Sequence, residues 1–208
     1  MDSNGLSSAV FGGGIRVTDG ASATIRGNTI TTNFGDGILV SDGAFARVED
    51  NTIEFNGRAT AGNDGFGEAG IRVAAAVVQA NGNVNRNPLN ISLIVEDGGV
   101  YRTGVILNRG QPDNPFGFEE ITAGAAGFAV IVNQGSQAVL RQVNVTGNVI
   151  AANASLLTIR GDERAPDTPQ ATLVGDATAL VKSVIRLPRS VDVTGTCLPR
   201  FDSFCEGP

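Results

Sequence analysis

Two aspartates, each followed by a glycine, lie 23 residues apart near the start of the chain: Asp19 and Asp42. Carboxylates held about 5 Å apart on adjacent strands could share a calcium ion, because calcium prefers several oxygen ligands. Asp-Gly is also a turn sequence in which the aspartate side chain bonds its own backbone. The turn interpretation is favoured over the metal site, because alanines (Ala74 to Ala76) occupy the next equivalent place.

Side chains for acid–base and nucleophilic catalysis are scarce. The chain has no histidine, which excludes Ser-His and Cys-His pairs. A β-elimination site with arginine or lysine as base beside calcium stays compatible with this composition. Aromatic platforms for stacking on a sugar are few, namely Tyr101 and phenylalanines such as Phe66, Phe116 and Phe118. Tyr101 is therefore a candidate ligand-binding residue.

An internal repeat sets the architecture that must position these residues. GIRVTDGASATIRGNTITTN (14–33) returns 23 residues later as GILVSDGAFARVEDNTIEFN (37–56), with eleven of the twenty positions identical. Within each unit apolar and polar residues alternate over short runs, as in Ile15 to Val17, which indicates strands. Gly and Asn between these runs indicate turns. A repeat of this length means a stack of equivalent units.

Three short strands per repeat, without a helix-period segment, predict an all-β fold: a right-handed parallel β-helix of about 7–8 coils with loop insertions. We expect the solenoid to span residues 12–195. Residues 1–11 form an N-terminal segment or partial cap, and residues 196–208 form a C-terminal tail. The rhythm is broken by GRATAGNDGFGEA (57–69), by GQPDNPFGFEEITAG (110–124) and by GDERAPDTPQ (161–170), and these stretches are predicted to be loops.

The pattern GIxVxDGAxAxIxGNTIxxN resembles the repeat of pectate-lyase-like and polysaccharide-epimerase-like parallel β-helix proteins, and of many non-enzymatic surface proteins. The resemblance covers roughly residues 12 to 85. In lyase-like relatives a groove on the solenoid binds uronate chains, with arginine as base and acidic residues holding calcium. The resemblance therefore implies that the outward Arg16 and Arg72 could meet a sugar carboxylate; a solvated face is the commoner alternative.

Asn28, Asn51 and Asn83 are predicted to stack at one corner of successive coils. Amides about 4.8 Å apart along a stack can donate hydrogen bonds to one another. The expected role of these three asparagines is structural.

The overall charge bears on partners. The formal net charge is −6, which argues against nucleic acid and anionic membranes, since either would require a basic stripe. No run of 18 apolar residues is present, so membrane insertion is not expected. The first residues, MDSNGLSSAV, do not read as a signal peptide. A leader removed earlier and a segment of a longer protein are the two explanations.

Cys197 and Cys205 are the two cysteines of the chain. Their spacing predicts a disulfide that closes the C-terminal tail and points to an oxidising, extracellular location. Two unpaired cysteines are the alternative, and zinc is not expected because further ligands of the right type are missing.

Together these features predict a secreted or cell-surface, non-catalytic β-helix. It would serve as a structural, adhesive or self-assembling module, with polysaccharide or other copies of itself as partners and no cofactor. The alternative is a calcium-assisted polysaccharide lyase, or a fragment of one.

Overall fold

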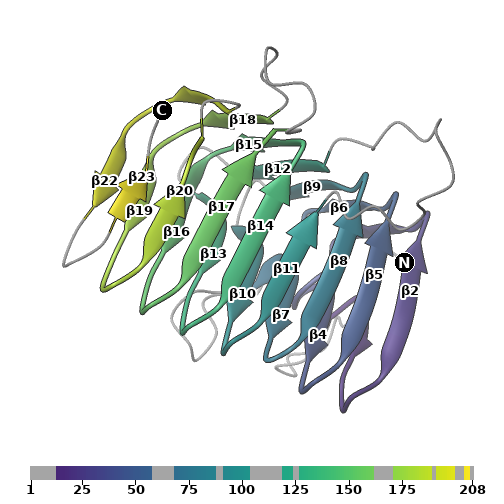
Figure 1. Ribbon diagram of the computed structural model, residues 1–208. Helices are drawn as coiled ribbons and strands as arrows, with labels where there is room; N and C mark the ends of the chain where they lie inside the picture. The colour runs from purple at the N-terminus through teal and green to yellow at the C-terminus, as the bar shows by residue number, and fades with distance from the viewer. Residues whose placement is uncertain are drawn as a thin grey trace, which may run out of the picture.

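The structure is a computed structural model that describes residues 13–57, 68–87, 91–103, 119–123, 127–161, 171–188, 191–199 and 204–206. Within these ranges the regular elements are all strands, and they form three parallel sheets of eight, eight and seven strands. The chain passes through the three sheets in turn and then begins the next coil (Figure 1). The predicted right-handed parallel β-helix, with its 7–8 coils, is confirmed.

Sheet 1 contains β1 (Ile15–Val17), β4 (Ile38–Ser41), β7 (Ala69–Ala74), β10 (Ile91–Glu96), β13 (Phe128–Val132), β16 (Asn148–Ala151), β19 (Ala177–Ala179) and β22 (Cys197–Pro199). Sheet 2 contains β2 (Ser22–Arg26), β5 (Phe45–Glu49), β8 (Val77–Asn81), β11 (Val100–Thr103), β14 (Gln137–Arg141), β17 (Leu156–Arg160), β20 (Val184–Arg186) and β23 (Phe204–Glu206). Sheet 3 contains β3 (Thr29–Thr31), β6 (Thr52–Glu54), β9 (Val84–Asn87), β12 (Glu119–Ala123), β15 (Val143–Thr146), β18 (Ala171–Val174) and β21 (Val191–Thr194).

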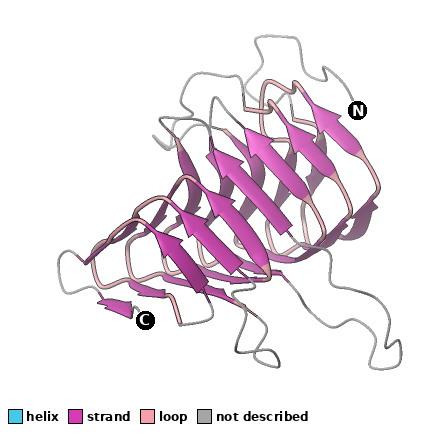
Figure 2. Cartoon of the chain, turned by 90° about the horizontal axis from the view of Figure 1, so that it is seen from above, coloured by secondary structure: helices cyan, strands magenta, loops and turns pink. Residues whose placement is uncertain are grey.

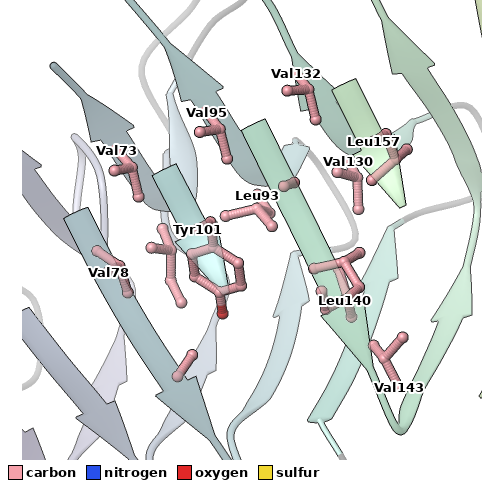
Figure 3. Packing of buried hydrophobic residues seen from close by; sticks show 14 of the residues in the cluster. Val73, Val78, Leu93, Val95, Tyr101, Val130, Val132, Leu140, Val143 and Leu157 are labelled. Atoms are coloured by element: carbon pink, nitrogen blue, oxygen red, sulfur yellow. The ribbon is translucent and has the colours of Figure 1, made fainter. Parts of the chain in front are cut away.

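Equivalent residues of successive coils lie directly beside one another. Ile15 pairs with Ile38, and Ile38 pairs with Ile71, although an insertion separates the second pair by 33 residues instead of 23. The coils follow one another along a single axis (Figure 2). Alternation along each strand directs one set of side chains inward, where Ile, Val, Leu and Ala fill a continuous core. Figure 3 shows this packing around Leu93 and Leu140.

The corners between sheets 1 and 2 require a left-handed backbone. Asp19, Asp42 and Asp97 have φ angles of 58°, 57° and 54°, and a glycine follows each of them with a positive φ. Asp tolerates this region better than most residues, and Gly adopts it without a steric penalty. The repeated Asp-Gly is thus explained by the turn that joins the two sheets.

Glycines at the start of sheet 1 strands leave room for the asparagine side chains that close the same repeat. A Cβ on Gly37 would approach Asn56 Nδ2 to 2.8 Å, and one on Gly70 would overlap the amides of Asn85 and Asn87. The Gly-Ile that opens each early repeat is therefore linked to the Asn that closes it.

Two predicted boundaries are wrong. Residues 119–123, assigned to the loop 110–124, form β12 and continue sheet 3. β22 and β23 extend sheets 1 and 2 past residue 195, so part of the expected tail belongs to the solenoid. The N-terminal segment 1–11 and most of the three predicted loops (58–67, 110–118 and 162–170) lie outside the described residues.

Candidate functional site

Arg72, a predicted ligand-binding residue, lies in an enclosed ion cluster on the outer side of sheet 1. Its Nε is 3.2 Å from Asp36 Oδ2, and its Nη1 is 2.7 Å from Glu96 Oε1. Its Nη2 lies 3.8 Å from Glu68 Oε2. The Arg72 side chain is 9% exposed. The prediction that Arg72 faces solvent is therefore wrong, because three carboxylates surround the guanidinium and the cluster is covered.

Asp36 is fixed in this cluster by the backbone as well as by Arg72. It lies just before β4, and its Oδ1 accepts a hydrogen bond from the Ala69 N–H at 2.6 Å, which ties together the starts of two neighbouring coils. Burial raises the pKa of Asp36 to about 7, Arg72 opposes that rise, and the charge of Glu68 adds to it. The cluster therefore joins three successive coils, and its charged groups are largely withdrawn from solvent.

Arg16, the other predicted arginine, is exposed on β1. In the strand register Arg16 lies beside Leu39, and Leu39 lies beside Arg72. The structure therefore does not bring the two arginines together. Arg16 stays a candidate contact for an anionic ligand, without Arg72 as its partner.

Tyr101, predicted as a platform for sugar stacking, is completely buried. It lies on β11 in sheet 2 and points into the solenoid among Val78, Leu93 and Leu140 (Figure 3). Its hydroxyl donates a 2.7 Å hydrogen bond to Glu119 Oε1. Burial and the charge of Glu119 raise the pKa of the Tyr101 hydroxyl well above its usual range. The prediction is wrong because Tyr101 occupies an inward position of the strand alternation.

Glu119 is a buried carboxyl that sequence reasoning missed. It opens β12 and is 1% exposed. Tyr101 donates to it, and so do the backbone N–H and side-chain amide of Asn83, each at 3.3 Å. Burial raises its pKa to about 7, with a further contribution from Asp50, while the hydrogen bonds from Tyr101 and Asn83 act in the opposite direction.

The raised pKa of Glu119 makes stability depend on pH. Because the folded state holds this proton more tightly than the unfolded state does, its stabilising contribution is complete below pH 4.5 and is lost as the pH rises through about 7. We expect Glu119→Gln, which stays neutral, to gain stability relative to the native chain across that interval, by about 3 kcal/mol in total. Urea unfolding of both proteins between pH 4 and 8 measures the difference.

The neighbouring Glu120→Gln is the matched control. Glu120 lies on the outer side of β12, where Arg86 bonds both its carboxylate oxygens, at 2.6 and 2.7 Å, and lowers its pKa. The ionised Glu120 carboxylate stabilises the fold above its unfolded-state pKa, and this stabilisation is lost as the pH falls. As the pH rises, Glu120→Gln should therefore lose stability relative to the native chain, whereas Glu119→Gln gains it. Parallel curves for Glu119→Gln and the native chain would contradict the assignment.

Asp19 and Asp42, the predicted calcium ligands, have the features of turn residues. Thr18 donates to Asp19 Oδ2 at 2.8 Å, and Ser41 donates to Asp42 Oδ2 at 2.7 Å. Ala75 takes the next position in the stack, with a φ of 49°. Among the described residues no cluster of three or more His, Cys, Asp or Glu side chains could hold a metal ion. The geometry supports the turn interpretation.

Asn28, Asn51 and Asn83 stack and bond as predicted. The side-chain amide of Asn28 donates to Asn51 Oδ1 at 3.1 Å, and that of Asn51 donates to Asn83 Oδ1 at 2.9 Å. Each also donates its backbone N–H to the same oxygen. Because the Asn83 amide donates to Glu119, the carboxyl is the fourth rung of the first ladder, defined as Asn28, Asn51, Asn83 and Glu119.

A second ladder runs along the corner between sheets 3 and 1. Asn33 donates its side-chain amide to Asn56 Oδ1 at 2.8 Å, and Asn56 donates its backbone N–H to Asn87 Oδ1 at 2.7 Å. The Asn56 amide also satisfies the Ile30 carbonyl at 2.8 Å. The signal was present in the sequence, since Asn33 and Asn56 close the two aligned repeats. No such signal marked Asp36 or Glu119.

The fold and its repeated corners define the class of right-handed parallel β-helix proteins. The family model described as "Right handed beta helix region" matches residues 2–92, and the three stacked parallel sheets fit a parallel β-helix repeat protein. No curated protein and no solved structure matches the chain significantly. Among the described residues, no helix is long and apolar enough to cross a bilayer.

Proposed function

We propose that the chain is a non-catalytic β-helix module of an extracellular or cell-surface protein, with a structural or adhesive role. One observation carries this proposal: the side chains best suited to chemistry are used to hold the coils together. Arg72 is enclosed by carboxylates, and Tyr101 and Glu119 lie inside the solenoid. A lyase needs its base and its calcium ligands in contact with substrate.

The experiment is an assay for β-elimination. The chain is incubated with pectate or alginate, with and without calcium, and the ultraviolet absorbance of the unsaturated product is followed. We expect no product in either condition. Calcium-dependent product that disappears in Arg16→Gln would overturn the proposal in favour of a lyase, because Arg16 is the candidate base exposed on sheet 1. Light scattering on the same samples tests whether copies of the chain associate.

A disulfide between Cys197 and Cys205, which we propose here, would support the extracellular location. The register sets Cys197 beside Ala177 and Cys205 beside Ile185, and the side chains of both neighbours are completely buried. The partly buried Cys197 also packs against the hydrophobic core. This arrangement supports a cross-link that closes the C-terminal end of the core.

We expect mass spectrometry of the non-reduced protein to find the Cys197 and Cys205 peptides joined. Reduction should destabilise the fold by about 2 kcal/mol, because the cross-link restricts the unfolded chain. The double variant Cys197→Ala, Cys205→Ala should be insensitive to reductant. Free thiols in the folded, non-reduced protein would contradict the pairing and remove this support for an extracellular location.

A further inference from the structure

The outer face of sheet 2 carries a largely apolar row that is accessible to solvent. Alternation turns a residue near the start of each strand outward, and the register places these residues beside one another. Val77 is 39% exposed, and the other members are half-buried. Figure 1 shows the strands that carry the row, β5 to β20, lying side by side. This set, called the apolar row, consists of Phe45, Val77, Val100, Gln137, Leu156 and Val184.

The outer faces of the other two sheets differ from this one. On sheet 1 the outward residues Arg72, Ile94 and Ile131 are buried. On sheet 3 the outward positions are mostly polar, and one row there runs through Thr31, Glu54, Arg86, Thr122 and Thr146. A flat, partly apolar sheet face is suited to packing against a second sheet, since the side chains of two facing sheets interdigitate.

Charged residues flank the apolar row on both sides in two of the coils. Asp42 and Asp97 lie at the corner that precedes the row. Arg47 and Arg102 point outward, two residues beyond it. All four side chains are exposed, and none of them forms an ion pair within the part of the chain that the structure describes. Opposite charges are therefore present on this face but are held apart from each other within one copy.

The two kinds of charge occur together from the second coil to the fifth. In the third coil Ala75 takes the corner, and Gln79 takes the outward position beside Arg47. In the fifth coil Gln134 takes the corner, and Val139 takes the outward position. Coils two and four thus carry both an aspartate and an arginine, whereas coils three and five carry neither.

A twofold axis along the apolar row would bring these opposite charges together. Two copies facing each other across this axis, with their solenoids parallel, place apolar row on apolar row. The arginine side of each copy then lies over the aspartate corner of the other, in the same coil. Arg47 of each copy meets Asp42 of the other, and Arg102 meets Asp97. Charge pairs at an interface select the orientation more than they add affinity.

An antiparallel pair of solenoids fits less well. With the twofold axis along the strands, the outward row of Arg47 and Arg102 lies over the same row of the other copy, and the aspartate corner lies over the aspartate corner. Like charges then face each other, which opposes association. The distribution of charge therefore selects the parallel arrangement.

We infer that the outer face of sheet 2 forms a parallel, twofold interface with a second copy of this chain. Lys182 and Arg186 are both cationic in the seventh coil, so the contact is expected to run from β5 to β17. Strands about 4.8 Å apart and about 16 Å long give roughly 400 Å² on each copy over this stretch, about half of a standard interface. The dimer should therefore be weak and dependent on concentration.

Cysteine cross-linking tests the position of the axis. Each member of the apolar row should meet its own copy, so Val77→Cys and Leu156→Cys should each give a disulfide-linked dimer on oxidation. Gln79→Cys is the matched control, because Gln79 lies on the same strand as Val77 but about 13 Å from its copy, too far for a disulfide. Peptide mapping identifies the residues that are joined.

The cross-linking pattern separates the two arrangements. An antiparallel dimer aligns only one position of the row with itself, so cross-linking at only one of Val77→Cys and Leu156→Cys would overturn the inference. Cross-linking of Gln79→Cys with equal efficiency would also overturn it, because random collision would then explain all three results.

Charge reversal tests the pairing by sedimentation. Arg102→Glu and Asp97→Lys should each weaken the dimer roughly tenfold, because each substitution acts twice in a symmetric pair. The double variant, in which the two charges are exchanged, should recover most of the loss. Gln134 occupies the equivalent corner with a φ of 54°, so a long side chain is accommodated there and thermal melting should show an intact fold.

Arg86→Glu is the control for charge alone. It changes the net charge as Arg102→Glu does, but Arg86 lies on sheet 3, so association should be unchanged. Monomers at every concentration up to about 1 mM, or no recovery in a folded double variant, would overturn the inference. The dimer does not depend on the non-catalytic role proposed above, which the lyase assay tests separately.

Discussion

Replacing Arg72 by methionine is expected to destabilise the fold by about 3–5 kcal/mol. The change leaves Asp36 and Glu96 enclosed without the cation that compensates them. Without the nearby guanidinium, the ionised form of these two carboxyls is less favoured. The loss of stability should therefore be smaller in acid, where protonation removes the buried charge. Urea unfolding of the variant and of the native chain at pH 5 and pH 8 measures both effects.

Leu39→Met is the control for the loss of Arg72. Leu39 is the register neighbour of Arg72 on β4, so it tests a change of packing at the same place without a change of charge. A swap between Leu and Met of similar volume should cost less than about 1.5 kcal/mol. A loss below about 1 kcal/mol for Arg72→Met at pH 8 would contradict the view that the ion cluster holds the first coils together.

The second large effect is expected from Asn51→Ala, at about 3 kcal/mol. Asn51 is the central rung of the first ladder and is 1% exposed. Its amide donates to the Ile25 carbonyl and to Asn83, and its oxygen accepts two hydrogen bonds from Asn28. Removing the side chain leaves several of these groups unsatisfied, and a buried unsatisfied group costs about 1–3 kcal/mol. Chemical denaturation gives the free energy of unfolding.

Asn28→Ala is the comparison for the central rung. Asn28 is half-buried in the first described coil and bonds to one neighbouring asparagine instead of two, so its loss should cost less. If the two substitutions lower the free energy of unfolding equally, stacking along the ladder adds no stability beyond that of a single turn. A cost at Asn51 near that of an exposed substitution would contradict the ladder as a source of stability.

The fold could be predicted because each copy of the repeat gives the same information about it. Matching residues such as Ile15 and Ile38 recur at one spacing, and in a parallel stack that spacing translates directly into contact. The first ladder followed by the same reasoning. β12 could not be found in this way, because its coil is interrupted by an insertion and Glu119 replaces the asparagine that would have kept the pattern.

The candidate site was harder to predict, because side-chain environment is not a local property. Arg72 falls at an outward position in the pattern, yet Asp36, Glu68 and Glu96 come from three other places in the sequence to enclose it. The ring chemistry of Tyr101 favours a role in ligand binding, whereas the alternation of β11 turns the side chain inward.

Every amide in the first ladder points the same way along the solenoid axis, and the row ends on a carboxyl. Hydrogen bonds in such a chain polarise one another, so each strengthens the next. Gain or loss of the proton on Glu119 should therefore change the polarity felt at Asn28, three coils away, without any movement of the backbone. Polarisation along the hydrogen-bonded ladder thus couples distant coils of the solenoid, in addition to the packing of their side chains.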